Sequence, residues 1–244
     1  MRNIKIIIEY DGTEYCGWQV QKNGMSIQQV LQKAIEDTVN HKISLTGASR
    51  TDAGVHAKGM VANFFTNSKI PCGKFPMAIN SKLPDDIVVT GAEEVGENFH
   101  SRYSNKGKRY SYYILNRRIP SAIYRRYTAH VPVLLDVEKM KKAAGYFLGT
   151  HDFSAFKSSG SSIKNNIRTV KSISITKTGD IIKLEIEADG FLYNMVRIIA
   201  GTLIDVGKGK IGPDDIDGII KSRDRNRAGK TAPPQGLYLD CVYY

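Results

Sequence analysis

The chain has 244 residues, of which 41% are hydrophobic and 24% are charged, so it is long enough to bury a core and has a globular composition. No apolar run approaches the roughly 18 residues of a membrane-spanning helix, and the N-terminus lacks the features of a signal peptide. The three cysteines, Cys16, Cys72 and Cys241, are far apart, which argues against a disulfide framework or a zinc site. We therefore expect a protein of the reducing cytoplasm, without a membrane partner.

The first part of the chain alternates strand and helix patterns. We predict strands at residues 3–10, 59–65 and 86–95 and a helix at residues 26–40. Ser26 and Gln29 have the spacing of a capping box, which marks the start of that helix. Asp52 then falls in the connection between a helix and the following strand, where functional side chains are often displayed.

The second part has a similar rhythm. We predict strands at 108–116 and 236–244, a hairpin at 170–188 that turns at Gly179, and helices at 136–149 and 194–207. Asp136 is the expected cap and Gly149 the expected stop of the first of these helices. The second helix is apolar nearly all round, which predicts that it is buried, and Arg197 lies inside it.

These patterns predict an α+β fold in which two similar strand-and-helix halves carry a largely antiparallel sheet. We place the boundary so that residues 1–105 form the N-terminal half with the Asp52 loop. Residues 106–244 then form the C-terminal half with the basic and aromatic surface. A central basic cleft is the expected place for a site.

The net charge of +11 is distributed unevenly. Residues 1–97 hold 10 basic and 11 acidic side chains, whereas residues 98–244 hold 25 and 13. Residues 98–135 contain no Asp or Glu, and their Lys and Arg alternate with tyrosines. Basic side chains can bind phosphates and aromatic rings can stack on bases, so their alternation indicates a nucleic-acid partner. The alternative is a solubilising surface over core tyrosines. Residues 221–230, with five basic residues and one acid, are either a phosphate contact or a solvated loop.

The segment GASRTDAGVHAKG, residues 47–59, carries the strongest chemical pattern. On extended backbone Arg50 and Asp52 share one face, where the cation would favour the ionised carboxylate of a nucleophile or base. The alternative is a structural ion pair with Gly54 making the turn. His56 could form an acid–base pair with a carboxylate, although a lone histidine is more often structural.

The stretch RTDAGVHA resembles the signature of the tRNA pseudouridine synthase A family. Further segments resemble the family in the same order along nearly the whole chain: EYDGTEYCGWQ (9–19), FHSRYSNKGKRYSYYI (99–114), HDFSAF (151–156), FLYNMVRIIAGTLIDVG (191–207) and PPQGLYL (233–239). One departure is Ser49, where many members have Gly before the Arg.

This resemblance implies the pseudouridine synthase fold and an isomerase that converts uridine to pseudouridine in the anticodon stem-loop of tRNA, the family's targets being positions 38, 39 and 40. It implies no cofactor and no metal, and it implies a homodimer. Asp52 corresponds to the essential carboxylate and nucleophile and Arg50 to its supporting partner. Tyr110 corresponds to the ring that stacks on the target uracil, and Arg197 and Leu237 to parts of the same pocket.

Other functions stay open from the residues alone. A non-catalytic RNA-binding protein would explain the charge and the tyrosines and would leave Asp52 dispensable. A glycosidase acting on nucleosides or RNA would use Asp52 but needs a second carboxyl group as acid, which none of the segments supplies in a recognisable arrangement. A metal nuclease would need a carboxylate cluster with ligand spacing, which the sequence lacks. For the isomerase, the carboxylate can either attack C1′ or take a proton to give a glycal.

Overall fold

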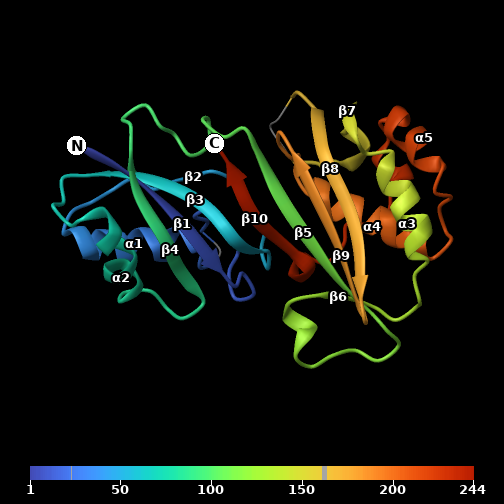
Figure 1. Cartoon of the computed structure of the whole chain (residues 1–244), viewed down its shortest axis with the longest axis horizontal. Helices are drawn as coiled ribbons and strands as arrows, with labels where there is room; N and C mark the ends of the chain where they lie inside the picture. Colours follow the sequence, from blue (N-terminus) through green and yellow to red (C-terminus); the bar gives the residue numbers. More distant parts are fainter. Residues whose placement is uncertain (23, 161–163) are drawn as a thin grey trace. The chain divides into compact units, whose positions relative to one another are not determined.

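The computed structural model describes residues 1–22, 24–160 and 164–244, and the chain divides into two compact units. Unit 1 comprises residues 1–106 together with 238–244, and unit 2 comprises residues 107–237. The end of the chain thus returns to the unit formed by its beginning. Each unit combines strands of a largely antiparallel sheet with helices, which confirms the predicted α+β class (Figure 1).

Unit 1 is built around a sheet with the strand order β4-β1-β3-β10, and the short strand β2 pairs with β3. Its elements are β1 (Arg2–Tyr10), α1 (Ile27–Val39), β2 (Thr46–Gly47), β3 (His56–Thr66), α2 (Phe75–Asn80), β4 (Ile87–Val95) and β10 (Leu237–Tyr243), the last of which belongs to this unit from Tyr238 onward. β1 runs antiparallel to both of its neighbours, whereas β10 pairs in parallel with β3, Tyr238 opposite His56. The predicted strands and helix of this part are confirmed.

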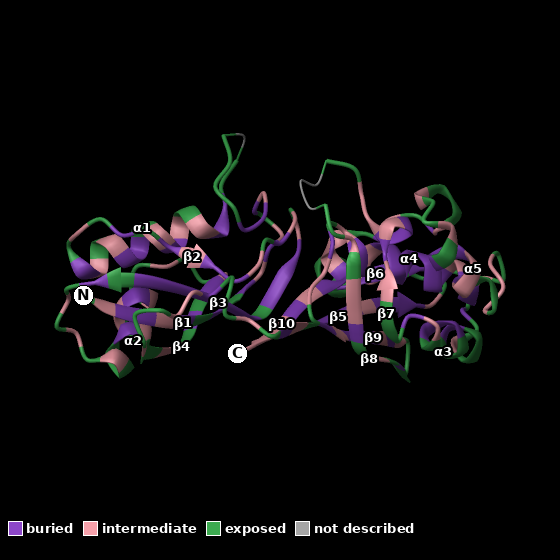
Figure 2. Ribbon diagram, turned by 90° about the horizontal axis from the view of Figure 1, so that it is seen from above, coloured by how far each residue is buried: buried purple, intermediate pink, exposed green. Residues whose placement is uncertain are grey.

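The core of unit 1 lies between one face of this sheet and the two helices. Side chains alternate along a strand, so Ile4, Ile6 and Ile8 of β1 point to the same face, where they are fully buried, while Ile7 is exposed on the other. Helical spacing predicts one apolar stripe on α1, and five of its six residues are buried while Val30 is partly exposed: Ile27, Val30, Leu31, Ala34, Ile35 and Val39. Figure 2 shows β3 largely in the colour of buried residues, whereas β4 is mostly intermediate or exposed.

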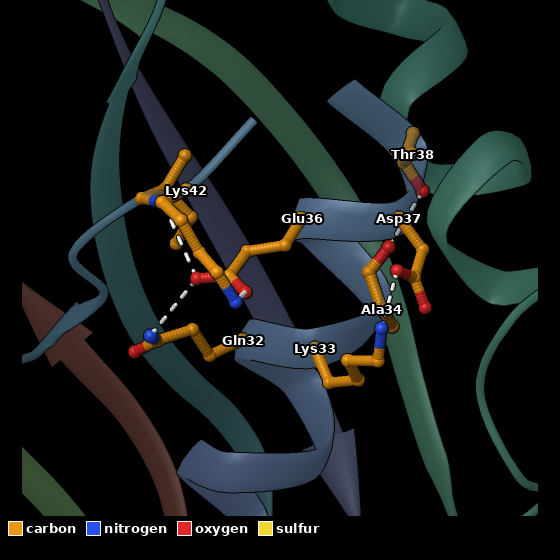
Figure 3. A network of polar contacts seen from close by, with 8 residues as sticks. Gln32, Lys33, Ala34, Glu36, Asp37, Thr38 and Lys42 are labelled. Atoms are coloured by element: carbon orange, nitrogen blue, oxygen red, sulfur yellow. Dashed lines mark hydrogen bonds and ion pairs between the residues drawn. The ribbon is translucent and has the colours of Figure 1, made fainter. Parts of the chain in front are cut away.

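The outer face of α1 carries a network of polar contacts (Figure 3). The Glu36 carboxylate accepts hydrogen bonds from Gln32 Nε2 at 3.2 Å and from Lys42 Nζ at 2.8 Å. Lys33 Nζ donates to Asp37 one turn further on, at 2.6 Å. The hydrogen bond from Lys42 is the main cause that lowers the pKa of the Glu36 carboxyl. This face is polar because it is solvated, while the opposite face of the helix supplies the core.

Unit 2 contains strands in the order β5-β9-β8-β7, each antiparallel to its neighbour, and β6 pairs in parallel with β5. Its elements are β5 (Gly107–Asn116), β6 (Ala129–Val131), α3 (Val137–Gly145), β7 (Gly149–Asp152), β8 (Ile167–Thr178), β9 (Ile181–Ala188), α4 (Met195–Gly207) and α5 (Asp215–Ser222). The predicted hairpin is confirmed, and Gly179 in its turn has a positive φ of 57°. Helix α4 is buried along most of its length, as its composition predicts.

Two predicted helix starts are confirmed, and one predicted stop is wrong. The side chain of Ser26 accepts from the backbone N–H of Gln29, and Asp136 does the same for Lys139. Helix α3, however, ends at Gly145, whereas Gly149, with φ 95°, opens β7. The apolar pattern continues past the helix because Phe147 is fully buried, although its backbone has already left the helix.

Among the helices of the described residues, none has the length and apolar character needed to cross a membrane. The longest, α1 and α4, have 13 residues each, well short of the roughly 20 that a bilayer requires.

Candidate active site

Asp52 lies in the loop between β2 and β3, and its side chain is half-buried. The loop is fixed to the segment that follows β1 by backbone hydrogen bonds: Trp18 N–H donates to the Thr51 carbonyl at 3.1 Å, and Gly54 N–H donates to the Tyr15 carbonyl at 3.4 Å. These two bonds hold the residues on either side of Asp52. The carboxylate is therefore displayed from a backbone that is held in place before any substrate arrives.

Glycines make this close contact between the two segments possible. Gly17 has φ 103°, and a Cβ on it would lie 2.4 Å from the Thr51 carbonyl oxygen. A Cβ on Gly12 would lie 2.0 Å from the carbonyl oxygen of Val55. Only glycine allows backbones to approach so closely. The segments 9–19 and 47–59, which the sequence analysis singled out separately, thus form one structural feature.

A buried hydroxyl pair and a buried indole complete the support of the loop. The Tyr10 hydroxyl lies 2.7 Å from Thr51 Oγ1, and both side chains are buried. Trp18 is also buried and lies against Gly47, whose missing side chain leaves room for the ring. The loop is consequently anchored on its inner side by packing as well as by hydrogen bonds.

Arg50 is exposed, and its side chain lines a pocket together with residues of the turn 100–103. In the part of the chain that the structure describes, its guanidinium lies within ion-pair distance of no carboxylate. Within that part of the chain, Arg50 thus forms neither the structural ion pair considered as an alternative from the sequence nor the expected ion pair with the Asp52 carboxylate. The cation is available for a ligand.

His56, at the start of β3, is only 2% exposed and has structural contacts. Its Nδ1 lies 3.1 Å from the Gly12 backbone nitrogen, which donates to it, and 3.1 Å from Asp11 Oδ1. The ring stacks on Tyr238 of β10 with a centroid distance of 4.7 Å. These contacts tie together three segments of unit 1 and favour the structural interpretation of His56.

In unit 2, Tyr110 lies on β5 opposite Ile186 of β9 and is only 6% exposed. The edge of its ring meets Phe191, with the centroids 5.0 Å apart and the planes at 83°. Tyr112 shares the same strand face and is fully buried, whereas Tyr113 points to the other face and is half-buried. As the alternation of side chains along a strand predicts, Tyr110 and Tyr112 therefore lie on one face of β5 and Tyr113 on the other.

Arg197 projects from the first turn of α4 and is half-buried. Its Nε donates to the Ala232 carbonyl and its Nη1 to Asn194 Oδ1, both at 2.8 Å. The Ala232 N–H returns a hydrogen bond to the Arg197 carbonyl at 3.0 Å. The guanidinium is thus held in a defined orientation by backbone and amide oxygens.

Leu237, the fourth residue after Pro233, is buried at the point where β10 begins. The segment just before it is fixed to β5, because the Tyr112 hydroxyl donates to the Pro233 carbonyl at 2.7 Å. Burial raises the pKa of the Tyr112 hydroxyl far above the physiological range, so it remains a donor.

The predicted site residues are divided between the two units. Asp52 and Arg50 belong to unit 1, and Tyr110, Arg197 and Leu237 belong to unit 2.

The uneven distribution of charge persists when the chain is divided by unit. Unit 1 holds 12 Lys and Arg against 12 Asp and Glu, whereas unit 2 holds 23 against 12. Within the cationic segment 221–230, one arginine makes structural contacts that the sequence did not reveal. Arg225 is half-buried and donates to the carbonyls of Ala228 and Gly229 and to Thr231 Oγ1, and burial lowers its pKa.

Metal-binding arrangements are absent from the described residues: no group of three or more His, Cys, Asp or Glu side chains lies close enough together there to hold an ion. The cysteines Cys16, Cys72 and Cys241 all lie in described segments and are not joined in disulfide bonds.

Comparisons with known proteins identify the family. The model of the family described as tRNA pseudouridine synthase matches residues 6–104 and 143–244. A tRNA pseudouridine synthase A of Acetivibrio thermocellus is 58% identical over 244 residues, and one of Thermoanaerobacter sp. (strain X514) is 59% identical over 244 residues. Both matches cover 100% of each chain.

Among solved structures, a chain in the crystal structure of a Cbf5-Nop10-Gar1 complex matches 96% of this chain and 57% of its own length, with 11% identity and a TM-score of 0.38. That score is too low to support an argument. The family model and the full-length relatives agree without it: the chain belongs to the tRNA pseudouridine synthase A family, whose members are isomerases.

Proposed function

We propose that this protein converts uridine to pseudouridine in the anticodon stem-loop of tRNA, with Asp52 as the residue that acts on the ribose. The observation that carries the proposal is the half-buried Asp52 carboxylate on a loop fixed by hydrogen bonds on both sides. That loop lies inside the family match at residues 6–104. A carboxylate held in this way is suited to act on one defined atom of a substrate.

The chemistry conserves the atoms of the nucleoside. The bond between ribose C1′ and uracil N1 breaks, the base turns, and C1′ bonds to C5. The hydrogen on C5 leaves to water and N1 acquires a proton. A carboxylate can support this by adding to C1′, as in a retaining glycosidase, or by removing a proton from the sugar to give a glycal. Neither route requires a redox cofactor.

The other predicted residues receive roles toward the uridine in this proposal. Arg50 supports the reaction as an exposed cation on the same loop, and Tyr110 stacks on the uracil. Arg197, oriented by Ala232 and Asn194, and Leu237 complete the surroundings of the base. The target base must leave its stack to react, which costs a few kcal/mol, and stacking on an aromatic ring offsets part of that cost.

The excess of basic side chains in unit 2 supports a polyanionic substrate. Phosphate contacts of this kind set affinity without choosing a base, so the choice of uridine depends on the shape of the stem-loop and the ease of base flipping. A homodimer in the cytoplasm belongs to the proposal on the strength of the family resemblance. A solution mass of one chain, 27.1 kDa, would contradict the dimer.

The experiment uses a tRNA transcript whose uridines carry tritium at C5, because bond formation at C5 must expel that hydrogen. Wild type and Asp52→Ala are compared at equal concentration. We expect tritium release by wild type and a loss of about ten-thousandfold or more in the variant. Asp37→Asn, an exposed carboxylate change on α1, serves as the control and should release tritium like wild type.

Each alternative function has its own result in the same experiment. Binding of the transcript with no tritium release from either protein, across several isoacceptor tRNAs, would replace the isomerase with a non-catalytic RNA-binding protein. Release of free uracil would indicate a glycosidase.

A further inference from the structure

A second binding feature lies in unit 1, separate from the Asp52 carboxylate. It is a pocket of about 270 Å³, and every residue that lines it belongs to unit 1. Asp52 is not among those residues. The volume is just below the roughly 300–1,000 Å³ of typical small-molecule sites, so any occupant is small.

One wall of the pocket is an exposed aromatic ring on a fixed turn. Tyr103 is 78% exposed, although its ring is already stacked on His100 with centroids 4.3 Å apart and planes at 30°. His100 Nδ1 accepts hydrogen bonds from the backbone N–H groups of Arg102 and Tyr103, at 3.2 and 3.3 Å. A large ring that remains exposed while its orientation is fixed is a stacking surface that has already lost most of its conformational freedom.

The turn is anchored from below by Ser101, which is fully buried. Its Oγ donates to the Thr46 carbonyl at 2.6 Å, its N–H donates to Asn63 Oδ1 at 2.9 Å, and its carbonyl accepts from the Tyr244 hydroxyl at 2.8 Å. With Ser101 held inward, its neighbours His100 and Arg102 are directed away from the core. The anchor therefore fixes the backbone of the turn that carries the exposed ring.

Two cations complete the pocket. Arg50 and Arg102 both line it and are exposed, and within the described residues neither guanidinium has a carboxylate at ion-pair distance. Trp18 and Leu45 also line it but are almost completely buried, so the surface that the pocket offers is mainly polar. The exposed Tyr103 ring suits the face of a base, and the Arg102 guanidinium suits phosphate oxygens.

We infer that this pocket binds a single nucleotide of the RNA other than the target uridine, with its base stacked on Tyr103 and its phosphate contacted by Arg102. The inference rests on the proposed function, since it takes the substrate to be tRNA. The occupant is an unpaired nucleotide, because a base that remains in a helical stack exposes no face to a tyrosine ring. The pocket thus helps to position the RNA while the target base is flipped.

The test is equilibrium binding of a tRNA transcript at several salt concentrations. Tyr103→Leu should weaken binding about five- to a hundredfold with an unchanged salt dependence, because it removes stacking and no charge. Tyr103→Phe keeps the ring and should bind like wild type. Arg102→Gln should weaken binding and make the plot of log affinity against log salt shallower by about one unit.

The matched control for charge is Lys33→Gln, which makes the same change in net charge in the same unit but on α1, outside the pocket. It should leave the salt dependence unchanged. Thermal unfolding of each variant separates a binding effect from a loss of folded protein.

Wild-type affinity in both Tyr103→Leu and Arg102→Gln would overturn the inference. Weak binding by Arg102→Gln with normal binding by Tyr103→Leu would overturn base stacking and leave a phosphate contact only. Tritium release by wild type is measured on the same samples: if it occurs while the two variants bind normally, the pocket inference fails and the proposed function stands. If wild type neither binds the transcript nor releases tritium, the proposed function fails as well.

Discussion

The two units differ in charge and in how they present the residues predicted to act on the uridine. Unit 1 has equal numbers of basic and acidic side chains and presents Asp52 on a loop fixed by glycine contacts and backbone hydrogen bonds. Unit 2 has 11 more basic than acidic side chains and presents a buried tyrosine and an arginine oriented by oxygens. A carboxylate and a surface that attracts phosphates have opposite electrostatic requirements, and the chain carries its net excess of basic side chains in the unit that does not contain Asp52.

After the loss already expected of Asp52→Ala, the largest effect is expected inside unit 2, from the two faces of β5. Tyr110→Leu should lower kcat/KM in the tritium-release experiment about five- to a hundredfold, because it removes the ring that stacks on the uracil. Tyr113→Leu, on the opposite face of the same strand, should stay within about twofold of wild type, and so should Tyr110→Phe. Equal losses in the two leucine variants would show that the strand, and not the Tyr110 face, is what matters.

The fixed loop of unit 1 can be tested by stability. Gly17→Ala forces a residue with a Cβ into φ 103° and places that Cβ 2.4 Å from the Thr51 carbonyl oxygen. We expect a loss of at least about 2 kcal/mol in the free energy of unfolding, measured by urea titration. Gly73→Ala has open space and no positive φ, so it should change that free energy by less than about 0.5 kcal/mol.

The difference in charge between the units predicts a difference in salt dependence. Replacing Arg118 and Arg126 of unit 2 by Gln should weaken tRNA binding about tenfold and make the salt dependence shallower by up to about two units. Replacing Lys33 and Lys42 of unit 1 by Gln changes the net charge equally and should affect neither. Both pairs are exposed. The same loss in the unit 1 pair would mean that net charge alone governs the binding.

The smallest effect concerns the polar face of α1, where Lys42 lowers the pKa of Glu36. A carboxyl whose pKa is lower in the folded state stabilises the protein above its unfolded-state value of about 4.5 and loses that contribution as the pH falls through the folded-state value. Glu36→Gln should therefore reduce the free energy of unfolding at pH 7 by less than about 1 kcal/mol. The difference from wild type should shrink as the pH falls below about 4.5; if it stays constant, the effect is not electrostatic.

Much of the local structure could be predicted because it depends on patterns within one segment. The apolar stripe of α1, its Ser26 cap and the turn at Gly179 each follow from neighbouring residues, and all three are confirmed. The stop at Gly149 was wrong, because the burial of Phe147 continues the apolar pattern after the helix has ended. Periodicity reports which residues are buried and does not report whether the backbone between them is still helical.

The candidate site likewise has features that the sequence reveals and features that only the structure reveals. The sequence singles out Arg50 and Asp52, but it could not show that Arg50 lines a pocket with the turn 100–103, since those residues are about 50 positions away. It also could not distinguish Arg225, which bonds to nearby carbonyls, from the exposed cations around it. Charge and residue type are visible in a sequence, whereas the partner of each side chain is not.

The sequence by itself determined the family and the α+β class and singled out the residues proposed for the chemistry, because these depend on residue identity and on short-range patterns. The tertiary structure decided which glycines allow two backbones to touch, which tyrosine is a fixed and exposed ring, and how β10 returns to pair in parallel with β3. Those features arise from contacts between residues far apart in the chain, and such contacts form only when the core is packed.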